Sequence, residues 1–136
     1  MGKIKILLLD DSEATLQHIS QLLLEKGYEI ATASSLEQAS NCVQKFNADA
    51  LLVDHVLGSG LNGLQAIQAI LLEFERIWIG KKTPSCALLV RSVLPVKDAE
   101  LARSQNITVL KKPVMGKDED FLQEVVFWLK ANKLLQ

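Results

Sequence analysis

Charged side chains follow three apolar segments of the sequence and could together carry out phosphoryl transfer. Asp10 and Asp11 come directly after one segment, Asp54 follows another, and Lys112 lies close behind a third. Crowded carboxylates repel one another, and a hard cation such as Mg²⁺ relieves that repulsion. The metal would also neutralise charge on a transferring phosphoryl group. Asp54 could then be the nucleophile that forms an aspartyl phosphate, and Lys112 could pair with a phosphate oxygen.

Short apolar runs alternate with segments of helical period along the whole chain. Strands are predicted at residues 3–9, 28–33, 50–53, 87–90 and 107–110. Between and after them, apolar spacing and capping signals predict five helices, which begin after Ser12, after Ser35, near Leu64, at Pro95 and near Phe121. This alternation is typical of a parallel sheet covered by helices.

Right-handed crossovers then favour one α/β arrangement, a doubly wound, five-stranded parallel sheet of order 2-1-3-4-5 with helices on both faces. In that order strand 1 neighbours strand 3. The carboxyl ends of these two strands border the ligand crevice of such sheets. We therefore expect Asp10, Asp11 and Asp54 to converge there.

Each charged residue has a more ordinary explanation when it is taken alone. An aspartate after a strand is usually a helix cap or a turn residue, which would suit Asp11. Lys111 and Lys112 alone would be solvated surface residues. The joint pattern favours a site, because every member falls at the same edge of the predicted sheet.

Composition limits the classes of function. The 136 residues are 49% apolar with a net charge of −1, which predicts one folded domain over residues 1–136 and argues against a nucleic-acid surface. No apolar run approaches the roughly 20 residues of a membrane span, and no signal peptide is evident. Cys42 and Cys86 lack metal-ligand spacing, so reduced thiols and a cytoplasmic location are expected.

These residues and their strand context resemble the receiver domain of two-component response regulators, a CheY-like family with a flavodoxin-like fold. The resemblance covers nearly the whole chain. It implies that Asp11 ligates Mg²⁺ directly and Asp10 mostly through water, while Asp54 is phosphorylated and also ligates the metal. It further implies that the backbone carbonyl of Val56 is a ligand and that Lys112 contacts the phosphoryl group. A cis peptide between Lys112 and Pro113 is implied as well.

The sequence departs from the family at two positions of its switch. The family has a serine or threonine after strand 4, whereas Arg91 stands there and Ser92 one residue later. We assign Ser92 as the hydroxyl donor beside Asp54 and Lys112, with Arg91 as the alternative, which would act as a cation. The family also has an aromatic residue at the position of Val109, which has no ring to move.

Two histidines and one tryptophan lie outside this group of charged residues. His18 and His55 are expected to be structural or surface residues, because the sequence shows a partner for neither. Trp78 lies in a stretch, residues 76–84, that is longer than the family needs. It could pack on the core of an extended helix or form part of an exposed partner surface.

The resemblance implies a signalling switch rather than an enzyme. A sensor histidine kinase or phosphotransfer protein would donate, Asp54 would accept, and affinity for a downstream protein partner would change; a second copy of the chain is a candidate partner. No direct contact with nucleic acid or membrane is expected. The alternative is a pseudo-receiver, a protein-interaction module that works without phosphorylation, which Arg91 and Val109 favour. A phosphatase with an aspartate nucleophile would need an acid-base aspartate two residues later. That residue is Val56, so the sequence argues against a phosphatase.

The phosphorylated form is predicted to lose its phosphoryl group slowly. Val56 offers no polar side chain to orient an attacking water molecule near Asp54. Loading the chain with acetyl phosphate, removing the excess and following the mass of the protein with time would measure the decay. A half-life of seconds would contradict the prediction.

Overall fold

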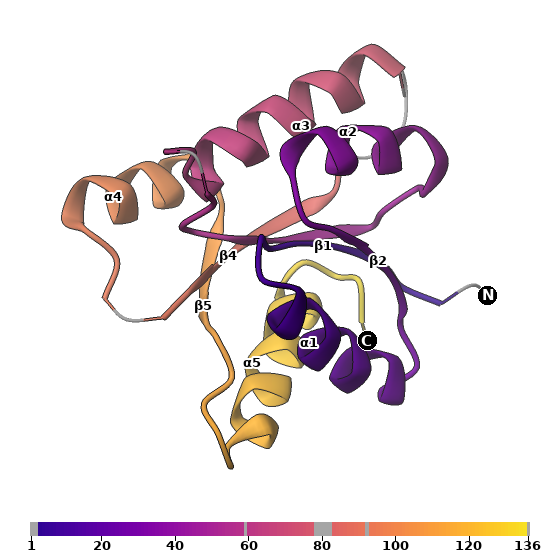
Figure 1. Cartoon of the computed structure of the whole chain (residues 1–136). Helices are drawn as coiled ribbons and strands as arrows, with labels where there is room; N and C mark the ends of the chain where they lie inside the picture. The colour runs from indigo at the N-terminus through magenta and orange to yellow at the C-terminus, as the bar shows by residue number, and fades with distance from the viewer. Residues whose placement is uncertain (1–2, 59, 78–82, 92, 136) are drawn as a thin grey trace.

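The computed structural model describes residues 3–58, 60–77, 83–91 and 93–135 as a five-stranded parallel sheet with five helices (Figure 1). The strand order is β2-β1-β3-β4-β5, as the sequence predicted. The strands are β1 (Lys5–Leu9), β2 (Glu29–Ala33), β3 (Ala50–Asp54), β4 (Ser85–Val90) and β5 (Thr108–Lys111). The helices are α1 (Glu13–Glu25), α2 (Leu36–Lys45), α3 (Gly63–Ile77), α4 (Val96–Ser104) and α5 (Asp118–Ala131).

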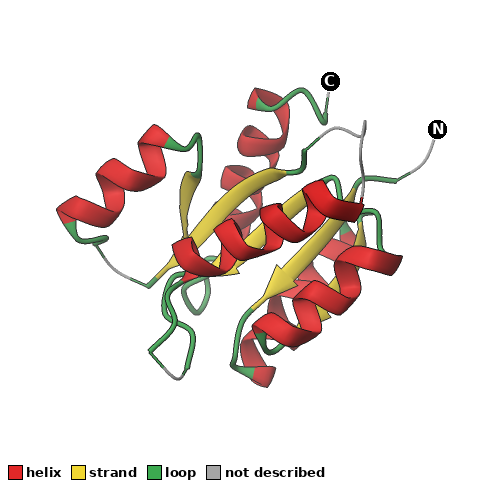
Figure 2. Ribbon diagram, turned by 90° about the horizontal axis from the view of Figure 1, so that it is seen from above, coloured by secondary structure: helices red, strands yellow, loops and turns green. Residues whose placement is uncertain are grey.

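Helices cover both faces of the sheet, and each face has its own apolar core. Alternate residues of β1 divide between the two cores: Leu7 and Leu9 pack under α2, α3 and α4, whereas Ile6 and Leu8 pack under α1 and α5. Figure 2 shows the sheet lying between the two layers of helices. The helix predicted near Phe121 is α5, and five of its residues are buried against the sheet: Phe121, Leu122, Val125, Trp128 and Leu129. In the described part of the chain, no helix has the length and apolar character needed to cross a bilayer.

Side-chain caps explain where the first helices begin. The Ser12 hydroxyl accepts a hydrogen bond from the Thr15 backbone N–H at 3.3 Å, so the predicted cap is confirmed. The Ser35 hydroxyl accepts from the Gln38 N–H at 3.2 Å. In a regular capping box the Gln38 side chain would accept from the N–H of Ser35, but here it accepts from the N–H of Ser34 at 2.8 Å, one residue before the cap.

Helix α3 begins with a complete capping box, which was not among the predicted capping signals. The Asn62 side-chain oxygen accepts from the Gln65 N–H at 2.9 Å, and the Gln65 side-chain oxygen accepts from the Asn62 N–H at 3.2 Å. The helix therefore begins at Gly63, one residue before the predicted start near Leu64. Trp78, whose two proposed roles concern the segment after this helix, lies outside the described residues.

Gly63 allows α3 to approach the strand end that carries Asp54. A Cβ atom built on Gly63 would overlap the backbone oxygen of Asp54 and would come within 2.6 Å of Leu88 Cδ1. The Gly63 N–H also donates to the backbone oxygen of His55 at 2.7 Å. The lack of a side chain at Gly63 thus sets the distance between the helix and the end of β3.

Replacing Gly63 with alanine is predicted to destabilise the fold by about 1 to 3 kcal/mol, because the added methyl group collides with the Asp54 backbone and with the fully buried Leu88 side chain. Urea unfolding of both proteins would measure the difference. Gly58→Ala is the matched control: its added Cβ meets only Asp11 Oδ2, at 3.2 Å, and the free energy of unfolding should change by less than about 0.5 kcal/mol. Equal effects of the two substitutions would contradict the prediction.

Candidate functional site

The three aspartates meet at the carboxyl ends of β1 and β3, as the sequence predicted. One carboxylate oxygen from each of Asp10, Asp11 and Asp54 lies within 4.8 Å of the others. Asp10 is fully buried and Asp54 is nearly so, whereas Asp11 is exposed. The parallel pairing of Leu9 with Val53 brings the two strand ends side by side. The cluster is therefore built by the topology, with one carboxylate open to solvent.

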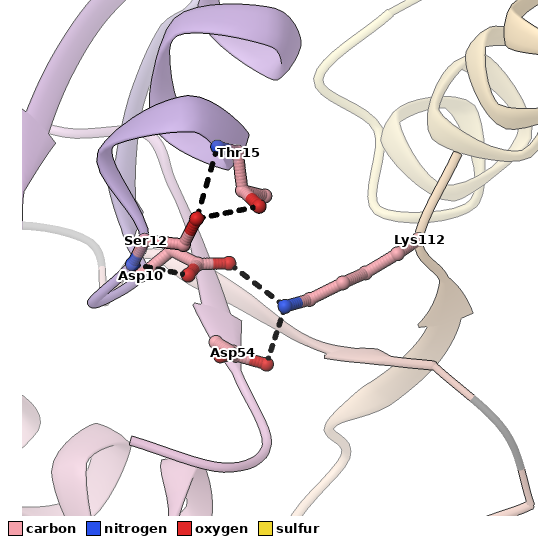
Figure 3. Close-up of polar contacts among 5 residues, drawn as sticks. All are labelled: Asp10, Ser12, Thr15, Asp54 and Lys112. Carbon is pink, nitrogen blue, oxygen red and sulfur yellow. Dashed lines mark hydrogen bonds and ion pairs between the residues drawn. The ribbon is translucent and has the colours of Figure 1, made fainter. Parts of the chain in front are cut away.

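Lys112 joins two of these carboxylates. Its Nζ atom lies 3.0 Å from Asp10 Oδ2 and 3.0 Å from Asp54 Oδ1, and its side chain is 9% exposed (Figure 3). The Lys112 backbone N–H donates to the carbonyl of Val90 at 2.9 Å, which extends the pairing of β5 with β4 beyond its last strand residue. The family resemblance implied a contact between Lys112 and a phosphoryl group, and nothing in the sequence indicated this bridge.

Backbone hydrogen bonds hold Asp10 in place. Its N–H donates to the carbonyl of Ala33 at 3.1 Å, and its Oδ1 accepts from the Ser12 N–H at 2.9 Å. Figure 3 shows Ser12 between this carboxylate and the first turn of α1, where its hydroxyl contacts Thr15. Asp10 thus has one oxygen bound to the start of the helix segment and the other paired with Lys112.

Burial raises the pKa of Asp54 above its ordinary value. The hydrogen bond from Lys112 acts in the opposite direction and lowers the pKa, while the nearby charge of Asp10 raises it again. The net direction is upward, so the folded site favours the protonated form of Asp54 more than water does. A cation bound beside Asp54 would favour the ionised carboxylate and act on its pKa in the opposite direction.

The donor set fits a divalent metal ion. Carboxylate oxygens are the ligands that Mg²⁺ prefers, and three of them converge here. With all groups ionised, three carboxylates and the Lys112 ammonium carry a formal charge of −2, which one divalent cation balances. The backbone carbonyl of Val56, the fourth expected ligand, belongs to a residue that lines the same open hollow of about 470 Å³ as Asp11 and Asp54.

The two unusual switch positions lie beside this hollow and on the edge of the sheet. Arg91 is exposed and lines the hollow together with Asp54. Ser92, the predicted hydroxyl donor, lies outside the described residues. Val109 is 40% exposed on the edge strand β5, so its side chain does not fill a buried aromatic position.

The peptide bond between Lys112 and Pro113 is trans, so the cis bond that the resemblance implied is wrong for this structure. The trans form is the more stable isomer of an X–Pro bond by about 0.5 to 1 kcal/mol. With this bond trans, Lys112 still makes its backbone bond to Val90 and its contacts with both carboxylates.

His55 has a partner that the sequence did not reveal. Its Nε2 lies 2.9 Å from Asp98 Oδ2 in the first turn of α4, and both side chains are partly buried, with 17% and 28% exposed. His18 similarly lies 3.1 Å from Asp118, but both of these side chains are more than 40% exposed. No local signal could have found the first pair, because its members are separated by 43 residues.

Comparison with known proteins gives a consistent answer. A family model described as "Response regulator receiver domain" matches residues 6–87, a range that includes all three aspartates and ends before Lys112. No curated protein sequence matches the chain significantly.

Similar solved structures span nearly the whole chain. Chemotaxis protein CheY4 of Vibrio cholerae has a TM-score of 0.75 at 24% identity and covers 94% of this chain and 100% of its own. A CheY-like receiver domain protein from Methanospirillum hungatei JF-1 has a TM-score of 0.76 at 17% identity, with 97% and 98% covered. A receiver domain protein from Clostridium thermocellum has a TM-score of 0.71 at 26% identity, with 98% and 99% covered. With the sheet order, the acidic cluster and the family match in agreement, the chain belongs to the receiver domain family of response regulators.

Proposed function

We propose that this receiver domain is an active phosphoacceptor, which takes a phosphoryl group on Asp54 with the help of Mg²⁺. The observation that carries the proposal is the position of Asp54. Its carboxylate lies at the open end of the sheet, shares a cluster with Asp10 and Asp11, and is 3.0 Å from the Lys112 ammonium. A nucleophile, a cation site and a fixed positive charge therefore meet at one point.

The transfer needs no other co-reactant than the phosphoryl donor. An Asp54 carboxylate oxygen attacks the phosphorus atom of a phosphohistidine or of an acyl phosphate. A new P–O bond forms as the P–N or P–O bond of the donor breaks, and the leaving imidazole or acetate takes the electron pair. The product is an aspartyl phosphate with no net oxidation or reduction.

The residues around Asp54 have separate roles in this step. A bound Mg²⁺ would supply charge neutralisation for the phosphoryl oxygens, held by Asp10, Asp11, Asp54 and the carbonyl of Val56. Lys112 would exchange its contact with Asp54 Oδ1 for one with a phosphoryl oxygen, while it keeps its contact with Asp10.

Two residues that follow β4 in the sequence are candidates for a further phosphoryl contact. Ser92 would donate a hydroxyl hydrogen bond, and Arg91 would supply a second cation. The exposed side chain of Arg91 lines the hollow with Asp54, which supports the cationic role.

The partners follow from the same proposal. A sensor histidine kinase or phosphotransfer protein would be the donor, and a downstream protein would recognise the phosphorylated domain, which we take to be residues 1–136 acting in the cytoplasm. The competing function is a pseudo-receiver that binds partners without phosphorylation. Arg91 and the exposed Val109 favour it, whereas the Asp54 cluster and its lysine favour the phosphoacceptor.

Incubation with Mg²⁺ and acetyl phosphate is predicted to add about 80 Da to the intact protein, the mass of one phosphoryl group. Asp54→Asn should abolish the gain because an amide is a poor nucleophile, and omission of Mg²⁺ should reduce it. Intact-protein mass spectrometry is the measurement. A Glu119→Gln variant, which neutralises an exposed carboxyl on α5, serves as the control and should load like the wild type.

The result separates the two functions. A wild-type protein that gains no mass while it remains folded would support the pseudo-receiver and overturn the phosphoacceptor. A mass gain that persists in Asp54→Asn would place the modification elsewhere.

The Asp54→Asn substitution is also predicted to stabilise the metal-free protein at neutral pH. Because folding raises the pKa of Asp54, the contribution of this group to stability is complete below its unfolded pKa of about 3.9 and is lost as the pH rises through the higher folded value. Asparagine carries no charge to bury, so it avoids that loss.

Thermal unfolding in EDTA at pH 7 and at pH 4 would test this sign. The variant should have the higher Tm at pH 7, and its advantage should shrink at pH 4. Added Mg²⁺ should raise the Tm of the wild type more than that of the variant, because the ion binds the folded site. A variant less stable than the wild type at pH 7 without metal would contradict the prediction.

A further inference from the structure

We propose that the contact between His55 and Asp98 is the mechanical connection between the acceptor site and helix α4 in this chain. The inference rests on the proposed function and concerns how that site is read. The His55 Nε2 atom lies 2.9 Å from Asp98 Oδ2. A carboxylate can only accept a hydrogen bond, so the Nε2–H of the ring is the donor.

The histidine is held at the site end by its backbone. Its N–H donates to the carbonyl of Leu89 at 2.9 Å, and its carbonyl accepts from the Gly63 N–H at 2.7 Å. It stands between Asp54 and Val56, the two residues whose side chain and carbonyl would hold the metal. Any shift of this backbone on metal binding or phosphorylation must therefore move the Cα atom from which the His55 side chain extends.

The aspartate is attached to a helix that has few other anchors. Ala102 is the one buried residue of α4 among those the structure describes, and Ala99 is partly buried. The cap position before the helix is Pro95, which makes no side-chain hydrogen bond. Leu94, just before the cap, is buried in the core, and the partly buried contact from Asp98 is a second attachment at this end of the helix.

The contact also offers a route from the acceptor site to α4 that does not use the family's two switch residues. Val109 has no ring to bury and is 40% exposed, and Arg91 occupies the position of the hydroxyl residue. His55 reaches α4 directly from the residue after the acceptor, without passing through either position. His55 is therefore a positioning residue, which couples phosphorylation or metal binding at Asp54 to the conformation of α4. By thermodynamic linkage, the conformation of α4 affects phosphorylation and metal binding at Asp54 equally.

Amide hydrogen exchange of residues 96–104 would test the connection. The full chain is measured metal-free, with Mg²⁺, and with Mg²⁺ and acetyl phosphate, and the mass of each sample reports whether Asp54 is loaded. In the wild type, loading should change exchange in α4 by roughly tenfold, within the range of ordinary coupling between sites. Asp98→Ala and His55→Phe should remove most of that change while the mass gain persists.

Two further variants distinguish coupling from simple loss of structure. Asp98→Asn keeps an oxygen that can accept from the His55 ring, so it should restore most of the change. Asp118→Ala breaks the other histidine–aspartate pair, His18 with Asp118, which joins α1 to α5 at the surface, and should leave the response of α4 intact. The compared quantity is the difference between loaded and unloaded protein, so a uniform loosening of α4 does not count as coupling.

The outcomes are decisive in each case. A loaded wild type with unchanged α4 exchange would overturn the connection, as would an Asp98→Ala protein that responds like Asp118→Ala. If no mass is gained, the phosphoacceptor proposal fails, and the samples with Mg²⁺ alone then test the connection between His55 and α4. A metal-induced change in α4 that Asp98→Ala removes would support the connection, and no such change would overturn it.

Discussion

The buried Lys112 ammonium between the carboxylates of Asp10 and Asp54 is the interaction on which the site depends. Two nearly dry negative charges at the end of a sheet would be costly without a counter-charge. The lysine supplies it at 3.0 Å from each, and its backbone is fixed by pairing to β4. One ammonium offsets only part of the negative charge, and the third carboxylate, Asp11, remains open to solvent.

The rest of the architecture brings these charges together from distant parts of the chain. The sheet order places β1 beside β3. Because all the strands are parallel, Lys112, which directly follows β5, lies at the same carboxyl-terminal edge of the sheet as the aspartates. Caps at Ser12 and Asn62 start the two helices that leave the site, and Gly63 lets the second of them lie against the strand. Each local choice in the sequence therefore serves the same global arrangement.

Much of this could be predicted from the sequence, because it depends on periodicity and on strand ends. The five strands, their order and the meeting of Asp10, Asp11 and Asp54 follow from apolar runs and the rules of parallel sheets. Contacts between side chains far apart in sequence could not be predicted. The pairing of His55 with Asp98 depends on where α4 docks, and the trans bond before Pro113 depends on the local path of the loop. Neither leaves a pattern in residue types.

The outer strand β5 has a consequence for how copies of this chain can meet. It is only four residues long, and two of them, Val109 and Lys111, turn outward. A short border with a protruding cationic side chain is a poor template for a neighbouring chain, because a new strand would gain few backbone bonds and would have to accommodate the lysine. Continuation of the sheet from one molecule into the next across the β5 edge, one of its two edges, is thereby discouraged.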